Sequence, residues 1–136
     1  MSTKVDQFCT NLRDRLDTAD ERLKSVRMSI QALPGQAEKA LREKLDEARR
    51  KLQAQKERVK QTRSNLEARA QQKMTETKEA ISQWKAKRET GKLNARADRA
   101  EAYAADAIDY AAATIDEAEE AILDAVVARI DADARQ

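Results

Sequence analysis

Seven basic side chains crowd the stretch "RRKLQAQKERVKQTR" (residues 49–63), which holds a single acidic residue. Lysine and arginine bind phosphate groups by charge and, for arginine, by paired hydrogen bonds. The same cations can instead pair with carboxylates on a neighbouring helix. The stretch therefore indicates either a polyanion-binding face or an ion-pairing face within the protein, formed by Arg49, Arg50, Lys51, Lys56, Arg58, Lys60 and Arg63.

The carboxylates that could neutralise this stretch lie near the other end of the chain. Residues 1–91 carry 22 basic and 14 acidic groups, a net charge of +8, whereas residues 92–136 carry 5 and 11, a net charge of −6. A chain that folds back at Gly91 brings residues 116–136 beside residues 46–66. We favour internal pairing, because the overall charge is only +2 and no aromatic side chain interleaves the cations to stack on bases. A weak, salt-sensitive phosphate contact stays open as an alternative.

The residues that enzymes use most are absent or isolated. The chain has no histidine, the commonest general base, and two glycines cannot build a phosphate-cradling loop. Asp116, Glu120 and Asp124 share one helix face and could bridge a divalent cation. They lack the shaped loop that hard cations prefer, so a face paired with another helix is the simpler interpretation. We predict no enzyme activity, no catalytic residues, no cofactor and no metal site.

The few aromatic residues suggest a different kind of surface. Trp84 lies on an apolar row of the second expected helix, and Tyr103 and Tyr110 lie one heptad apart on the third. Such residues pack a core or form a contact with a partner. The candidate self-association or partner surface consists of Met74, Ile81, Trp84, Tyr103, Ile108 and Tyr110.

Long helices must position all of these groups. The chain is rich in Ala, Glu, Lys, Arg, Gln and Leu, and its turn-forming residues are Pro34–Gly35 and Gly91. Apolar residues in the first helix, about 2–33, alternate at gaps of four and three, as in a coiled-coil seam. This row consists of Val5, Cys9, Leu12, Leu16, Ala19, Leu23, Val26, Ile30 and Leu33.

Two further helices follow, at about 36–90 and about 94–134. The apolar spacing of the second changes near residues 62–74, where gaps of four replace the alternation, and this predicts a change of packing. The third is rich in alanine and carries a wide apolar stripe that suits more than one neighbour.

The expected fold is all-α, a single elongated domain over residues 1–136 built from three long antiparallel helices. Reversals at 34/35 and 91 predict a coiled-coil-like bundle of about 2–33, 36–66 and 116–136. Residues 67–115 then form a protruding two-helix arm beyond the first helix.

This architecture predicts a non-enzymatic structural or interaction protein, a self-associating bundle that acts as scaffold or adaptor. A homo-oligomer, preferably a dimer, is the expected state, with a protein partner also possible and nucleic acid disfavoured. The alternative is an amphipathic protein that binds a lipid, granule or polyanion surface. No apolar run reaches the ~20 residues of a membrane span, and one cysteine cannot form an internal disulfide. A cytoplasmic location is therefore expected.

Overall fold

The computed structural model describes residues 3–134, and helices make up nearly all of this part of the chain. No strand occurs among the described residues, which confirms the all-α class. The elements in chain order are α1 (Thr3–Ala32), the 3₁₀ turn η1 (Leu33–Gly35), α2 (Glu38–Thr75), α3 (Lys78–Ala86) and α4 (Thr90–Asp133).

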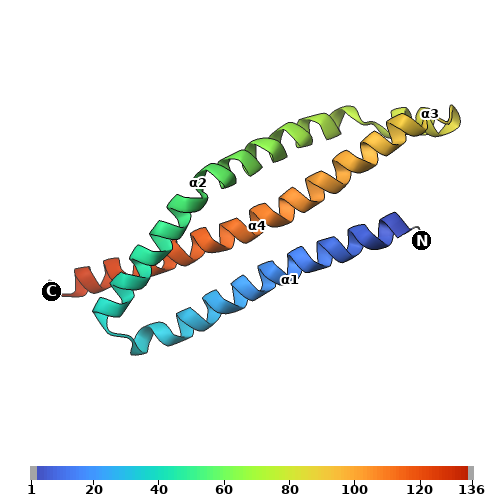
Figure 1. Cartoon of the computed structure of the whole chain (residues 1–136). Coiled ribbons are helices and arrows are strands. Elements are labelled where there is room, and N and C mark those ends of the chain that lie inside the picture. The colour runs from blue at the N-terminus through green and yellow to red at the C-terminus, as the bar shows by residue number, and fades with distance from the viewer. Residues whose placement is uncertain (1–2, 135–136) are drawn as a thin grey trace.

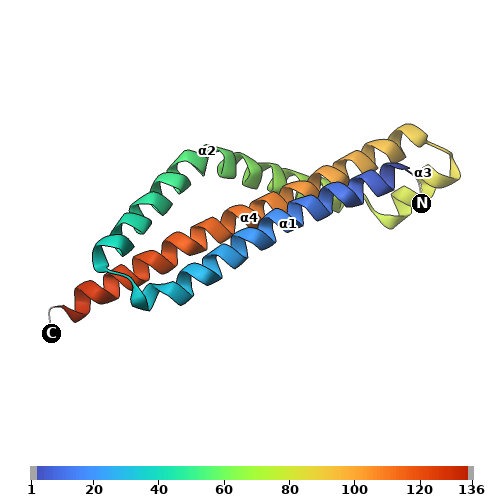
Figure 2. The same cartoon turned by 60° about the horizontal axis from the view of Figure 1, so that its bottom comes forward.

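The last helix, α4, is the centre of the molecule. It packs along α2, along α1 and against the short helix α3. Both ribbon views show α4 running the length of an elongated bundle, with α2 bowed along one side of it (Figure 1, Figure 2). α1 and α4 run in the same direction, whereas α2 runs opposite to both (Figure 1). A helical bundle is therefore present, as expected from the sequence, and α4 holds it together because α1 and α2 each pack on it.

The hydrophobic core lies where α2 begins and α4 ends. Leucine side chains from the turn and from α2 enclose two apolar side chains of α4, and all are buried. Burial of a leucine side chain contributes about 1.5–3 kcal/mol, so this cluster is the main source of stability in the bundle. Its buried members are Leu33, Leu41, Leu45, Ala48, Leu123 and Val127, with Ile122, Val126 and Ile130 packed against them.

The reversal between α1 and α2 follows the sequence prediction closely. α1 ends at Ala32, and Pro34 stands within the first turn of η1, where a missing N–H costs nothing. The backbone N–H of Gln36 donates to the carbonyl of Leu33 at 3.1 Å and closes the turn. The sequence predicts the first helix over about 2–33, and Ser2 lies outside the described residues.

The single helix predicted over about 36–90 is wrong, since the structure divides it into α2 and α3. The backbone leaves the helical conformation at Glu76 and Thr77. The Thr77 hydroxyl then accepts a hydrogen bond of 3.1 Å from the N–H of Ala80 and caps α3. Helix-forming residues flank this break on both sides, so propensity alone does not reveal it.

The second reversal occurs at Arg88 rather than at Gly91, which corrects the predicted boundary near 94. Arg88 adopts a positive φ of 54°, the left-handed conformation that most side chains avoid. Gly91 lies in the first turn of α4 with a negative φ. The earlier reversal shifts the pairing of α2 and α4: Arg63 contacts Tyr110, whereas a reversal at Gly91 would place it level with Glu119.

The two-helix arm is shorter than the predicted 67–115. Arg15 of α1 contacts Asp109 of α4, and twelve more residues of α1 precede Arg15 in the structure as far as Thr3. α1 therefore accompanies α4 well into the region assigned to the arm (Figure 1). The segment free of α1 is reduced to the tip formed by α3 and the start of α4.

Candidate functional site

One buried carboxylate joins the three long helices. Asp116 of α4 has a side chain only 3% exposed, and it receives a cation from each neighbouring helix. Arg22 of α1 donates to its Oδ2 at 3.1 Å, and Lys51 of α2 donates to its Oδ1 at 3.2 Å. Both oxygens are thus used, as a buried charge requires. One residue of the predicted acidic face, Asp116, is therefore buried and links the three long helices.

Ion pairs continue along the α2–α4 contact on both sides of Asp116. Arg49 donates to Glu120 at 3.2 Å and to Asp124 at 2.8 Å. Exposed pairs of this kind contribute little each, roughly 0–1 kcal/mol. Their contribution to the stability of the bundle is therefore small. The other pairs between segments 38–76 and 96–131 are Arg42–Asp131, Arg69–Asp106, Arg96–Glu76 and Arg99–Glu76.

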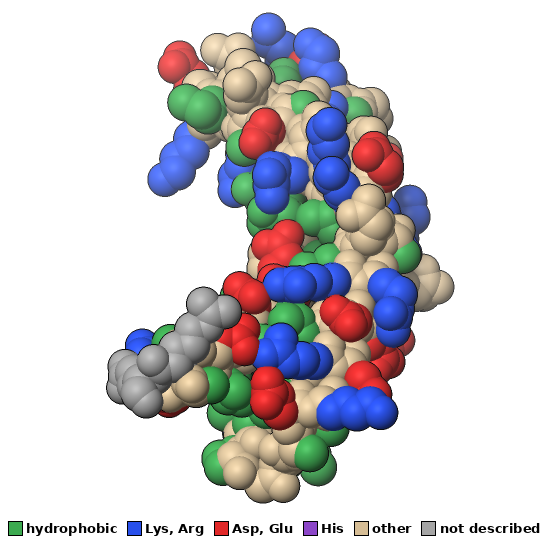
Figure 3. Space-filling model, turned by 90° about the vertical axis from the view of Figure 1, so that its left-hand side faces the viewer, with side chains coloured by type: hydrophobic (Ala, Val, Ile, Leu, Met, Phe, Trp, Pro, Cys, Tyr) green, Lys and Arg blue, Asp and Glu red, His purple; other side chains and the backbone are tan. Residues whose placement is uncertain are grey.

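The seven cations of residues 49–63 divide into two groups. Arg49, Lys51 and Arg63 contact α4. Figure 3 shows basic and acidic side chains interspersed over the end of the molecule that carries the C-terminus. The remaining four make no ion pair within residues 3–134, and all are exposed: Arg50, Lys56, Arg58 and Lys60.

Arg63 binds an aromatic residue instead of a carboxylate. Its Nε donates to the hydroxyl of Tyr110 at 3.2 Å, and its guanidinium carbon lies 5.7 Å from the ring centroid. The hydrogen bond to Tyr110 raises the pKa of Arg63 above its ordinary value. The guanidinium cation is also attracted to the electron-rich face of the ring. Tyr110 therefore takes part in the packing of α2 against α4.

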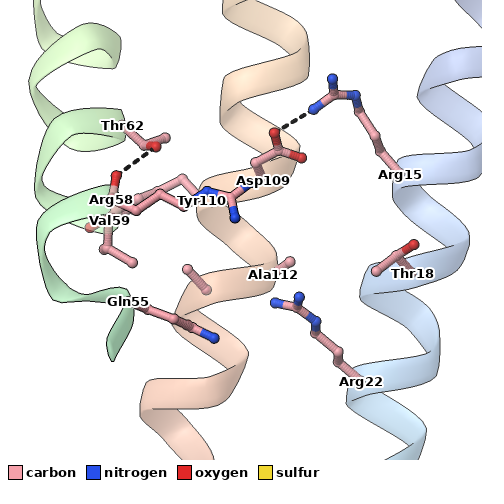
Figure 4. A pocket seen from close by; sticks show the side chains of 11 residues that line it. Arg15, Thr18, Arg22, Gln55, Arg58, Val59, Thr62, Asp109, Tyr110 and Ala112 are labelled. Atoms are coloured by element: carbon pink, nitrogen blue, oxygen red, sulfur yellow. Dashed lines mark hydrogen bonds and ion pairs between the residues drawn. The ribbon is translucent and has the colours of Figure 1, made fainter. Parts of the chain in front are cut away.

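An arginine-lined pocket of about 290 Å³ opens between α1, α2 and α4. Arg15 and Arg22 reach it from α1, and Arg58 reaches it from α2 (Figure 4). Arg15 pairs with Asp109 and Arg22 with Asp116, so two of the three cations are already neutralised. The pocket offers hydrogen-bond donors to a small anion, with Arg58 as the cation free of an ion pair among the described residues.

The predicted aromatic and apolar surface is spread over three helices. Met74 is 82% exposed at the end of α2. Tyr103 is half-buried, with the Lys73 ammonium 5.5 Å from its ring centroid. Ile81 and Trp84 of α3 and Ile108 and Tyr110 of α4 are also half-buried. Apart from Met74, these residues are partly covered within the chain, and their use as a partner surface stays a prediction.

The apolar residues of α1 divide into two rows, a division that periodicity alone does not reveal. The inner row consists of Val5, Leu12, Ala19 and Val26. Its exposure falls along the helix: Val5 is 39% exposed, Leu12 and Ala19 are half-buried, and Val26 is buried. The outer row is exposed: Leu16 is 53% exposed, Leu23 45% and Ile30 42%. The outer row is therefore an apolar face of α1 that the described residues leave largely uncovered.

Among residues 3–134, no group of three histidine, cysteine or carboxylate side chains lies close enough to hold a metal ion. In the same part of the chain, no helix combines the length and the apolar character that crossing a membrane requires.

In comparisons with known proteins, no family model, no curated protein and no solved structure matches the chain.

Proposed function

We propose that this chain is a non-enzymatic interaction protein, an elongated helical bundle that self-associates and acts as a scaffold or adaptor. One observation carries the proposal, namely the exposed outer row of Leu16, Leu23 and Ile30 along one helix. Exposed leucine is common singly, but a row repeated every seven residues is the pattern of a helix that packs on another helix. Burial of this row would remove apolar surface from water at about 25 cal/mol per Å².

The ion pairs of the buried carboxylate inside the bundle support the same proposal. The buried carboxylate of Asp116 is occupied by Arg22 and Lys51, and both of its oxygens accept hydrogen bonds. A group held in this way stabilises an assembly of helices rather than activating a substrate. The single exposed Cys9 has no partner for an internal disulfide, and the proposal places the protein in the cytoplasm.

The mass of the protein in solution tests this proposal. Light scattering on a sizing column is expected to give a multiple of the 15.3 kDa chain mass, with two chains favoured. Leu16→Asp is expected to lower that mass, because it places a charge in the outer row. Met28→Asp is the matched control, since Met28 is 69% exposed on the same helix but lies outside the row. A wild-type protein that stays monomeric at high concentration would overturn the proposal.

A second candidate is binding of a phosphate-bearing surface, and the four exposed cations on α2 favour it. Arg50, Lys56, Arg58 and Lys60 have no acidic partner among the described residues, so they can neutralise phosphates. Binding of a short double-stranded DNA is expected to weaken steeply between roughly 50 and 200 mM salt, because each phosphate contact releases a counterion. A double change of Lys56 and Lys60 to Gln is expected to weaken it further, and absence of binding at low salt removes this candidate.

A further inference from the structure

The outer row of α1 continues into an apolar groove beside α4. Leu23 and Ile30 form one wall of a groove of about 320 Å³, and Ile115 and Ile122 of α4 form the other. Almost all of the lining is apolar. An apolar groove between two helices can accept the apolar face of a further helix.

Charged side chains lie beside the two apolar rows of α1, and their sign alternates along the helix. One position beyond each residue of the inner row, α1 carries Asp6, Arg13, Asp20 and Arg27, seven residues apart and all exposed. Arg13 and Arg27 make no ion pair within residues 3–134, and Asp20 has only an exposed contact of 3.0 Å with Lys24. Flanking charges of this kind select the partner and the direction of a second helix.

This order of charges is complementary to itself when read backwards. In an antiparallel pair related by a two-fold axis, the flanking positions of one helix meet the same positions of the other. When Leu16 of both copies lies at the axis, Asp6 of each copy meets Arg27 of the other, and Arg13 of each meets Asp20 of the other. All four flanking contacts then join opposite charges.

Other arrangements of the same two helices lose this match. A shift of one heptad, with Leu16 of each copy level with Leu23 of the other, brings Arg13 to Arg27 and Asp20 to Asp20. A parallel pair places the flanking charges on opposite edges of the contact, where they do not meet. Like charges that face each other are destabilising, so the charges select one register.

We propose, on the basis of the self-association proposed above, that the groove is occupied by α1 of a second copy of this chain. The two α1 helices lie antiparallel, with Leu16 against Leu16 at the two-fold axis and Cys9 of each copy against Leu23 of the other. The charge pairs Asp6–Arg27 and Arg13–Asp20 flank this seam. The second copy's helix also covers Ile115 and Ile122 of α4, which completes a four-helix contact.

Charge reversal at the two central flanking positions tests this arrangement. Arg13→Asp and Asp20→Arg each turn two attractive contacts into repulsive ones, so each variant alone is expected to dimerise about tenfold more weakly. The two variants mixed in equal amounts are expected to form a heterodimer, because both central positions are acidic in one chain and basic in the other. The double variant Arg13→Asp/Asp20→Arg is expected to regain the wild-type dissociation constant. Sedimentation equilibrium of each sample measures all three, and circular dichroism verifies that every variant is helical.

Each outcome separates this arrangement from the broader proposal. A wild-type dimer that tightens on Arg13→Asp indicates the register shifted by one heptad, and a dimer indifferent to both changes indicates another surface or a parallel pair. Either result overturns the antiparallel arrangement and leaves self-association intact. A wild-type monomer overturns both.

Discussion

Arg22 of α1 donates a hydrogen bond of 3.1 Å to Asp116 of α4, a residue 94 positions later in the chain. Arg15 contacts Asp109 at the same separation of 94 positions. Seven residues separate the two arginines, and seven separate the two aspartates. Equal spacing in the same direction means that α1 and α4 lie parallel and in step, so these two pairs fix the register between the first and last helices.

Loss of the buried carboxylate is expected to destabilise the bundle. Asp116→Ala leaves Arg22 and Lys51 without their acceptor at the junction of three helices, at a cost of about 2–3 kcal/mol. Asp124→Ala is the control, because the side chain of Asp124 is 55% exposed where it pairs with Arg49, and the cost stays under about 1 kcal/mol. Urea denaturation followed by circular dichroism measures both, and equal losses would contradict the role given to Asp116.

Leucines of the core and of the outer row are expected to respond differently to truncation. Leu45→Ala removes a side chain that is 4% exposed in the core and should cost about 2–5 kcal/mol of unfolding free energy. Leu16→Ala removes a side chain that is 53% exposed and should cost under about 1 kcal/mol when the protein is dilute enough to be monomeric. Thermal unfolding at low concentration makes the comparison. A large loss from Leu16→Ala would mean that this residue is buried within one chain.

At the second chain reversal, glycine at position 88 is expected to give a more stable protein than the arginine that the chain has there. Arg88→Gly relieves the strain of φ 54° and should stabilise the protein by about 0.5–1 kcal/mol, after the greater flexibility of glycine in the unfolded chain is deducted. Arg88→Ala keeps the backbone strain and is the control, with chemical denaturation as the measurement for both. If alanine stabilises as much as glycine, the effect belongs to the loss of the arginine side chain.

The glycine present nearby is expected to be replaceable. A methyl group on Gly91 meets no atom within 4 Å, and its φ is negative. Gly91→Ala should therefore stabilise α4 by about 0.4–1 kcal/mol, chiefly by restricting the unfolded chain. Chemical denaturation measures the gain. A loss of stability would show that the chain needs glycine at this reversal, as the sequence alone suggested.

Cysteine cross-linking is expected to report the direction of the α1 pair. In the proposed arrangement Cys9 of one copy lies beside Leu23 of the other, so Leu23→Cys should give a disulfide-linked dimer under mild oxidation. The wild-type chain, with Cys9 alone, should remain largely uncross-linked on a non-reducing gel, since the two Cys9 residues lie toward opposite ends of the seam. Efficient cross-linking of wild-type protein through Cys9 would indicate a parallel pair.

Much of the architecture follows from the sequence because its signals are local. Helix-forming residues fill the segments around Pro34–Gly35, and the turn occurs there as predicted. The seam of α1 also identified residues that pack, including Val26 and Leu33. Periodicity identifies apolar rows, but it does not show which row packs against other helices of the same chain. The exposure of Leu16 therefore became known only from the structure.

The remaining differences come from contacts between distant residues. Glu76 leaves the helix and accepts hydrogen bonds from Arg99, with Arg96 3.8 Å away, and nothing in the local sequence indicates that pairing. Arg88 takes the left-handed conformation although Gly91 stands three residues later. The predicted pairing of cations 49–63 with α4 depended on that reversal, which is why individual partners differ from those a reversal at Gly91 would give.

The central place of α4 has a consequence for how the chain is made. Leu123 and Val127 supply the α4 side of the core, yet they follow Leu45 by 78 and 82 residues in the chain. Until they emerge, Leu41 and Leu45 have only the turn beside them to cover their apolar surface. α1 and α2 therefore remain marginal helices until these residues are synthesised, and a chain that stops before Leu123 would lack the α4 side of this core.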